Sequence, residues 1–107
     1  AVGTEDFSRL DLRIAEIVDV ERIPGSEKLF KLRVDIGGGE AKEAVTALAH
    51  LYKAEELRGK LVAVVANLKP TTIFGVTSEV MILASEDDKG YALLQPSRKV
   101  KPGSRIK

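Results

Sequence analysis

Apolar and polar residues alternate in the first third of the chain with the two-residue period of a β-strand. Between residues 12 and 23, LRIAEIVDVERI, the apolar positions that follow this period are Leu12, Ile14, Val18 and Val20. Glu16 interrupts the series, so the strand is expected to change face at Ala15 and Glu16. This change predicts a β-bulge or a sharp coil at these residues, either of which would let the strand bend around a small barrel.

Residues 29–37, LFKLRVDIG, alternate more regularly and predict a second strand. The Pro-Gly pair before it and the GGGE sequence after it predict a turn and a hairpin. Lys31 and Arg33 fall on one face of this strand. The other face is apolar and holds Phe30, Leu32, Val34 and Ile36.

The rest of the chain predicts further short strands and two short helical segments. A helical turn is expected over residues 5–11, with Thr4 as its N-cap and with Phe7 and Leu10 on one face. Phe7 and Phe30 are both assigned to the core. A helix is expected over 51–57, ended by Gly59, and SEDDKG predicts a turn. The remaining strands are expected at 43–50, 61–68, 80–84 and 91–94.

This order of elements predicts an all-β fold. Five or six short strands with one helix between the third and the fourth is the order of the OB-fold. We therefore expect a five-stranded antiparallel barrel with a short inserted helix and an N-terminal helical turn; a split α+β sandwich is the alternative. No internal repeat or linker divides the sequence, so residues 1–107 are predicted to form one domain.

Composition excludes several classes of protein. Hydrophobic residues make up 44% of the chain and charged residues 31%, as in a folded soluble domain. No apolar run approaches the roughly 20 residues that cross a bilayer, and the N-terminus lacks signal-peptide features, which predicts a cytoplasmic location without membrane contact. The absence of cysteine excludes disulfides, thiolate metal sites and cysteine nucleophiles.

The charges are unevenly distributed although the net charge is only +1. Residues 1–60 hold ten Lys/Arg and twelve Asp/Glu, whereas residues 61–107 hold seven and four. The last ten residues, RKVKPGSRIK, hold five cations and no acid. This segment is either a solvated tail or a phosphate-contacting one.

No constellation of residues predicts catalysis. His50 is the only histidine and has no recognisable metal-ligand spacing around it, and no serine lies in a Gly-x-Ser-x-Gly motif. We therefore predict a binding module with no enzymatic activity, no metal and no cofactor. Aromatic residues are few, at 5%, so base stacking is weakly supported. A basic, polar surface fits a folded RNA recognised through its backbone and 2′-hydroxyls better.

Four stretches resemble one known family in order and spacing: DFSRLDLRIAEIVDVERIPGSEKLFKLRVDIGG, YKAEELRGKLVAVVANLKP, FGVTSEVMILA and LLQPSRKVKPGSRIK. The family is the tRNA-binding domain found at the C-terminus of many methionyl-tRNA synthetases, in free-standing dimeric tRNA-binding proteins and in the endothelial monocyte-activating polypeptide. Its most distinctive motifs here are Asp11-Leu12-Arg13, Lys28-Leu29, and Asn67-Leu68-Lys69-Pro70 followed by Gly75 and Ser78.

The resemblance implies an OB-fold that binds tRNA mainly by its shape, has no catalysis of its own, forms a homodimer and associates with methionyl-tRNA synthetase. The binding residues that it implies are Lys28, Lys31, Arg33, Asn67, Lys69, Ser78 and Met81. The cations would neutralise phosphates, Asn67 and Ser78 would donate to phosphate or ribose oxygens, and Met81 would add apolar contact. Alternatively, Asn67 caps its own loop and Met81 belongs to the core. If Lys31 and Asn67 are contacts, alanine at either should weaken binding without changing the melting curve.

The sequence departs from the family at two places. Thr71 and Thr72 stand where relatives usually carry Lys or Arg, which predicts weaker or differently placed binding. Val80 replaces a small residue, and the resulting SEV sequence resembles CsaA-like export chaperones, which have the same barrel and bind unfolded peptides. Peptide binding is therefore the alternative function. A purely structural dimerisation or docking domain is a third possibility.

Overall fold

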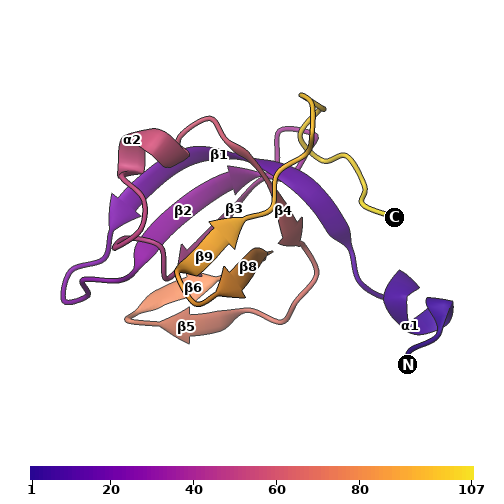
Figure 1. The fold of residues 1–107 in the computed structure, drawn as a ribbon, viewed down its shortest axis with the longest axis horizontal. Helices are drawn as coiled ribbons and strands as arrows, with labels where there is room; N and C mark the ends of the chain where they lie inside the picture. The colour runs from indigo at the N-terminus through magenta and orange to yellow at the C-terminus, as the bar shows by residue number, and fades with distance from the viewer.

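The computed structural model describes all 107 residues, and its centre is an antiparallel sheet of five strands in the order β3-β2-β1-β4-β7 (Figure 1). The hairpins β5–β6 and β8–β9 form two further small sheets, and the short helix α2 lies between β3 and β4 in the chain. The elements are α1 (Thr4–Ser8), β1 (Leu12–Arg22), β2 (Phe30–Asp35), β3 (Ala41–Thr46), α2 (Ala54–Leu57), β4 (Leu61–Val65), β5 (Thr71–Ile73), β6 (Val76–Ser78), β7 (Met81–Ile82), β8 (Ala84–Asp87) and β9 (Gly90–Leu93).

The two edges of this sheet meet through the segment that precedes β7. The backbone N–H of Glu79 donates to the carbonyl of Glu43 at 2.8 Å, and the N–H of Glu43 donates to Oε1 of Glu79 at 3.1 Å. Ser78 Oγ accepts from the N–H of Val45 at 3.1 Å. These bonds satisfy the free edge of β3 and nearly close the barrel. The all-β, OB-like prediction is confirmed.

The core lies inside the barrel and contains no polar or charged residue. Phe30, Leu32 and Val34 of β2 are fully buried, and Lys31 and Arg33 point the other way, as the alternation predicts. Leu57 of α2 is also fully buried, so this short helix covers one end of the core. The largest completely buried side chains are Phe30, Ile17, Leu32, Leu48, Leu57, Val34, Val62 and Val64.

The bulge in β1 lies at Val18 and not at Ala15 and Glu16. The register pairs Ile17 with Val34 and then skips one residue, which leaves Val18 as the extra residue with 45% of its surface exposed. Ala15 is fully buried and paired with β4. The predicted change of face is confirmed, since the buried residues switch from Leu12 and Ile14 to Ala15 and Ile17. It arises because β1 pairs with β4 over its first half and with β2 over its second, and only the position of the bulge was wrong.

The N-terminal helix forms, but its predicted cap and core contacts are wrong. Gly3 occupies the N-cap, and Thr4 is the first helical residue and makes no capping hydrogen bond. Phe7 and Leu10 are exposed, at 45% and 40%, because α1 buries no residue and lies at one end of the molecule, away from the barrel (Figure 1).

The second half of the chain holds shorter strands than the sequence predicts. β4 ends at Val65 instead of residue 68, β3 lies at 41–46 instead of 43–50, and the run 80–84 is divided between β7 and β8. Residues 85–87, expected in a turn, belong to β8, and residues 71–78, for which the sequence predicts no strand, form the β5–β6 hairpin. Gly59 ends α2 with a φ of 88°, as predicted.

The basic C-terminal segment is not a free tail. The N–H of Ile14 donates to the carbonyl of Ser104 at 2.8 Å, and the N–H of Gly103 donates to the carbonyl of Ile14 at 2.7 Å. Ile106 donates in the same way to Leu12 at 2.9 Å. The segment therefore runs along the outside of β1 and displays its cations from a fixed backbone. No helix in the chain is long and apolar enough to cross a membrane.

Candidate nucleic-acid interface

The outward face of β2 carries two cations that share one carboxylate. Lys31 Nζ lies 3.5 Å from Oε2 of Glu43 on β3, and Arg33 Nη1 lies 3.9 Å from Oε1 of the same residue. Since one negative charge faces two positive ones, the pairing leaves net positive charge on this face. Both cations are solvent-accessible and available to a phosphate.

A groove of about 190 Å³ lies beside this basic face and brings together three predicted site residues, Lys69, Ser78 and Met81. Val45 of β3 joins the two features, because it lines the groove and pairs with Lys31 in the β2–β3 register. We call this continuous surface the outer face; its residues are Lys31, Arg33, Glu43, Val45, Lys69, Thr71, Ser78, Glu79 and Met81.

Further charges lie on the outer face or next to it. Lys42 Nζ lies 3.6 Å from Oε2 of Glu79, whereas Lys69 is exposed and has no ion-pair partner. Lys42 pairs with the inward-facing Val34 and so belongs to the other face of β3, which leaves the outer face with three cations and two carboxylates. Lys28 lies in the exposed loop before β2, also without an ion pair, where its carbonyl accepts a hydrogen bond from the N–H of Ala49.

Ser78 and Met81 have different roles in this surface. The Ser78 hydroxyl donates its single proton to the carbonyl of Val80 at 3.1 Å and accepts from the N–H of Val45, so it holds the barrel edge together. Met81 is 51% exposed, which places its side chain at the surface and not in the core. Met81 therefore offers apolar contact area, while Ser78 positions the groove wall.

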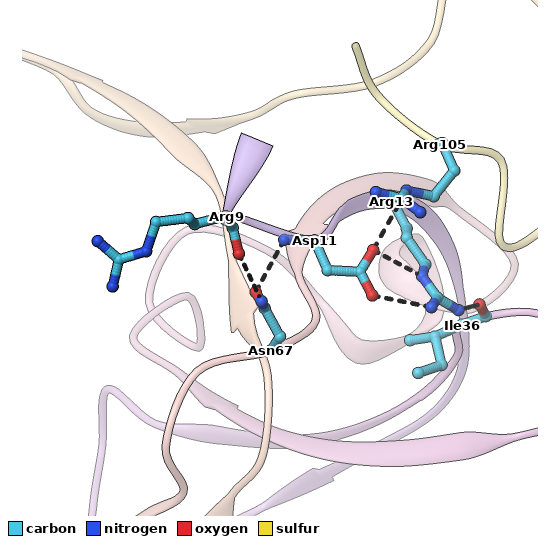
Figure 2. Close-up of polar contacts among 6 residues, drawn as sticks. All are labelled: Arg9, Asp11, Arg13, Ile36, Asn67 and Arg105. Carbon is cyan, nitrogen blue, oxygen red and sulfur yellow. Dashed lines mark hydrogen bonds and ion pairs between the residues drawn. The ribbon is translucent and has the colours of Figure 1, made fainter. Parts of the chain in front are cut away.

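Asn67 is not among the residues that line the groove, and it connects the end of β4 to the start of β1 (Figure 2). Its Oδ1 accepts from the N–H of Asp11 at 2.8 Å, and its Nδ2 donates to the carbonyl of Arg9 at 2.8 Å. It does not cap its own loop, and it lines a separate hollow with Phe7 and Leu10 of the N-terminal segment. The structure thus separates Asn67 from Lys69, although only Leu68 lies between them in sequence.

These contacts change the expected result of replacing Asn67. Because Asn67→Ala removes two hydrogen bonds, we expect the free energy of unfolding to fall by about 1–2 kcal/mol. A urea titration followed by circular dichroism would measure the loss. Thr72→Ala is the control, since its hydroxyl touches only Thr77 Oγ1, at 3.5 Å, on the exposed hairpin. An unchanged midpoint for Asn67→Ala would show that these bonds contribute nothing.

The motif Asp11-Leu12-Arg13 forms a charge cluster with the C-terminal segment (Figure 2). Arg13 binds Asp11 through two hydrogen bonds, Nε to Oδ1 at 2.9 Å and Nη2 to Oδ2 at 2.8 Å. Its Nη1 also donates to the carbonyl of Ile36 at 3.0 Å, and Arg105 Nε lies 3.3 Å from Asp11 Oδ1. The motif therefore ties β1, the end of β2 and the C-terminal segment together.

This cluster shifts the pKa values of its members. The hydrogen bonds from Arg13, with the charges of Arg13 and Arg105, hold the pKa of Asp11 below its usual value, against the opposing effect of partial burial. The same pairing raises the pKa of Arg13. A depressed carboxyl pKa means that the folded state favours the ionised Asp11.

The shift predicts how stability depends on pH. The contribution of Asp11 should be complete above its unfolded pKa of about 3.8 and should be lost as the pH falls through the lower folded-state pKa. We expect wild type to exceed Asp11→Asn in free energy of unfolding by a constant amount at pH 5–7, and the difference to shrink below pH 4. Urea titrations across this range would measure it; a difference that grew in acid would contradict the assignment.

Sequence patterns missed the β5–β6 hairpin and its tip residue Phe74. The signal was present, since the β-branched runs TTI and VTS flank the two-residue sequence Phe-Gly. Phe-Gly is not one of the usual hairpin turn pairs, so the local pattern alone does not predict a hairpin here. The sequence also does not identify Val45 as a groove residue. It predicts a strand over 43–50 but does not indicate which of its side chains point outward.

The sequence of this chain is similar to known proteins over nearly its whole length. A family model described as "Putative tRNA binding domain" matches residues 12–105. The chain is 47% identical to the methionine–tRNA ligase of Archaeoglobus fulgidus and 50% identical to that of Methanoculleus marisnigri, over 98% and 99% of its own length but 16% of each relative. It therefore spans about a sixth of these relatives.

Solved structures of two kinds share the fold. One is a MetRS-related protein from Pyrococcus horikoshii, 32% identical, with a TM-score of 0.91 over 99% of this chain and 97% of the other. The other is the chaperone CsaA from Bacillus anthracis, 30% identical, with a TM-score of 0.89 over 100% of this chain and 99% of the other.

Proposed function

Since this chain belongs to the tRNA binding domain family, we propose that it is a non-catalytic module that binds folded tRNA through the outer face. The observation that carries the proposal is the single surface on which Lys31, Arg33 and Lys69 lie beside a groove, with only partial compensation by carboxylates. Cations at fixed positions can contact several phosphates of one folded RNA, and such contacts depend on shape more than on sequence.

The hairpin beside the groove modifies this mode of binding. Thr71 and Thr72, where relatives usually carry cations, lie exposed on β5 and offer hydroxyls in place of charge. Fewer phosphates are then neutralised, so the salt dependence of binding should be shallower than for a relative with Lys or Arg there. In our proposal, Lys28 adds a phosphate contact at the start of β2.

Titration of bulk tRNA with the protein at 50 and 200 mM monovalent salt tests this function. Fluorescence anisotropy or gel shift should show micromolar or tighter binding that weakens as salt rises. A fully paired RNA and a denatured RNA of similar length test recognition of shape. Absence of salt-sensitive binding at micromolar protein would refute the proposal.

Peptide binding is the second candidate, and one structural feature favours it. A mainly apolar hollow of about 300 Å³ lies next to the groove and is lined by Val45, Thr46, Ala47, Leu48, Met81, Ile82, Leu83, Ala84 and Tyr91. An extended apolar peptide would fit such a surface, and the likeness to CsaA structures supports it. Suppression of the aggregation of a denatured client would test it, and no effect at stoichiometric excess would eliminate it.

The molecular context follows from the relatives. We propose that residues 1–107 act as one unit in the cytoplasm, appended to or associated with a methionyl-tRNA synthetase, and that the module forms a homodimer. Val2, Phe7 and Leu10 support dimerisation, because they are exposed apolar residues around one hollow at the N-terminus. Sedimentation equilibrium should give twice the chain mass, and Phe7→Ser should shift the equilibrium toward the monomer; a wild-type monomer at 100 μM would contradict this part.

A further inference from the structure

The β5–β6 hairpin carries at its tip the most exposed aromatic residue of the chain. Ile73 pairs with Val76, so the turn consists only of Phe74 and Gly75. Phe74 is 61% exposed, more than Phe7 or Tyr91, and it is absent from the residues packed against the core. The hairpin, which has three residues in each strand, therefore presents one aromatic ring to solvent at its tip.

The backbone at this tip is unfavourable for phenylalanine. Phe74 has a φ of 51° and Gly75 a φ of 75°, so both turn positions are left-handed, as in a type I′ turn. Phe74 is the only residue other than glycine with a positive φ. Asn-Gly suits this turn far better, because asparagine tolerates the left-handed region and a bulky side chain does not. The ring strains the turn and gains little packing in return, which is typical of a residue retained for a ligand.

The surroundings of the hairpin indicate which ligand. Ile73 and Thr71 of β5 line the groove of the outer face together with Lys69, which lies two residues before the first residue of the hairpin. The hairpin thus has an unpaired cation near its base and an exposed ring at its tip, and these two groups together are able to hold a phosphate and a nucleobase of one RNA strand. Folded RNAs offer such bases in single-stranded loops and bulges, where they are free to unstack.

We propose that Phe74 stacks on an unpaired base of the RNA bound at the outer face, while Lys69 contacts a neighbouring phosphate. This proposal rests on the proposed function and adds to it, because stacking selects loops and bulges over continuous duplex. It also offsets the missing cations at Thr71 and Thr72, since stacking gains affinity without adding to the salt dependence.

Phe74→Asn tests the proposal directly, because asparagine keeps the turn and removes the ring. We expect a melting temperature equal to or above that of wild type, affinity for tRNA reduced roughly 10-fold, and an unchanged salt slope. Phe74→Tyr should bind as wild type does. Leu94→Asn, which replaces another exposed apolar residue outside the hairpin, is the matched control and should leave affinity unchanged.

A tryptophan probe tests stacking independently, since the chain contains no tryptophan. The emission of Phe74→Trp should be quenched when tRNA binds and much less by a fully paired RNA, whereas Val18→Trp, on the exposed bulge of β1, should not respond. If wild type does not bind tRNA, the proposed function fails and this inference with it. If wild type binds but Phe74→Asn binds within two-fold of it, or tRNA leaves the Phe74→Trp emission unchanged, only the stacking inference is overturned.

Discussion

Replacing Lys31 and Lys69 together with alanine is expected to lower the affinity for tRNA by roughly 25- to 60-fold at 0.1 M monovalent salt. The two lysines lie on either side of Val45 and are available to separate phosphates. Each neutralised phosphate contributes about 0.7–0.9 to the slope of log affinity against log salt. Losing two contacts should therefore also make the salt dependence shallower by about 1.4–1.8.

The two single variants should differ for a structural reason. Lys69 has no ion-pair partner, so Lys69→Ala removes only a phosphate contact. Lys31 lies 3.5 Å from Glu43, and its loss leaves that carboxylate less compensated on the same face. We expect Lys31→Ala to weaken binding more, because the exposed Glu43 also repels phosphate. Lys31→Ala combined with Glu43→Gln should recover part of the loss.

A double variant of equal charge provides the control. Lys53 precedes α2 and Lys89 lies in the β8–β9 turn, both exposed and outside the outer face. Lys53→Ala with Lys89→Ala changes the net charge by the same amount as the Lys31 and Lys69 double variant. The comparison therefore separates the effect of where the charges lie from the effect of net charge. Anisotropy titrations at four salt concentrations would measure affinity and slope. Equal losses for the two double variants would mean that binding depends on net charge and not on the outer face.

The β2 part of the candidate interface could be predicted from the sequence because its information is local. Six residues alternate strictly between turn signals, so the burial of Phe30, Leu32 and Val34 places Lys31 and Arg33 on the opposite face. No distant contact is needed to decide their orientation. Long regular strands are therefore the part of such a site that sequence reasoning describes best.

The role of Asn67 could not be predicted, because its partners lie far away in the chain. Its bonds reach Asp11 and Arg9, 56 and 58 residues earlier. Ser78 behaves similarly, since its contact with Val45 spans 33 residues and closes the barrel. The side chains of both residues are committed to tertiary hydrogen bonds, and no local pattern distinguishes such a polar residue from one that awaits a ligand.

The position of the C-terminal segment could not be predicted either, because it also depends on contacts with residues far away in the chain. Its composition resembles that of a solvated tail, but its course along β1 depends on a close approach between two glycines. An added Cβ at Gly103 would lie 2.7 Å from the Cα of Gly37, and one at Gly37 would lie 2.8 Å from the Cα of Gly103. Only a residue without a side chain permits this approach at either position. The sequence shows both glycines but does not show that their backbones meet.

Gly103→Ala is therefore expected to be strongly destabilising, by about 3 kcal/mol. The new methyl group would meet backbone atoms on both sides, since it would also lie 2.8 Å from the carbonyl oxygen of Ile36. That oxygen accepts the hydrogen bond from Arg13, so the charge cluster would be disturbed as well. A φ of 92° adds the cost of a left-handed conformation.

Gly38→Ala separates the two causes. Gly38 also has a positive φ, of 65°, but an added Cβ there has no neighbour within 4 Å. We expect the free energy of unfolding of Gly38→Ala to fall by about 1 kcal/mol, which is the cost of a left-handed backbone conformation alone. Urea titrations of both variants would give the difference that belongs to the close approach. Equal losses would mean that the C-terminal segment shifts without cost and that the contact with Gly37 is not a constraint.

A chain that ends at Val100 sets the upper limit of the effect. If the alanine cannot be accommodated, the C-terminal segment can detach from β1. The free energy of unfolding then falls only by the amount that docking of this segment contributes. We expect Gly103→Ala to approach the stability of the shortened chain and to lose the hydrogen-exchange protection of the Ile14 N–H, whose acceptor is Ser104. Protection retained at Ile14 would show that the segment stays docked and that the strain lies in the barrel.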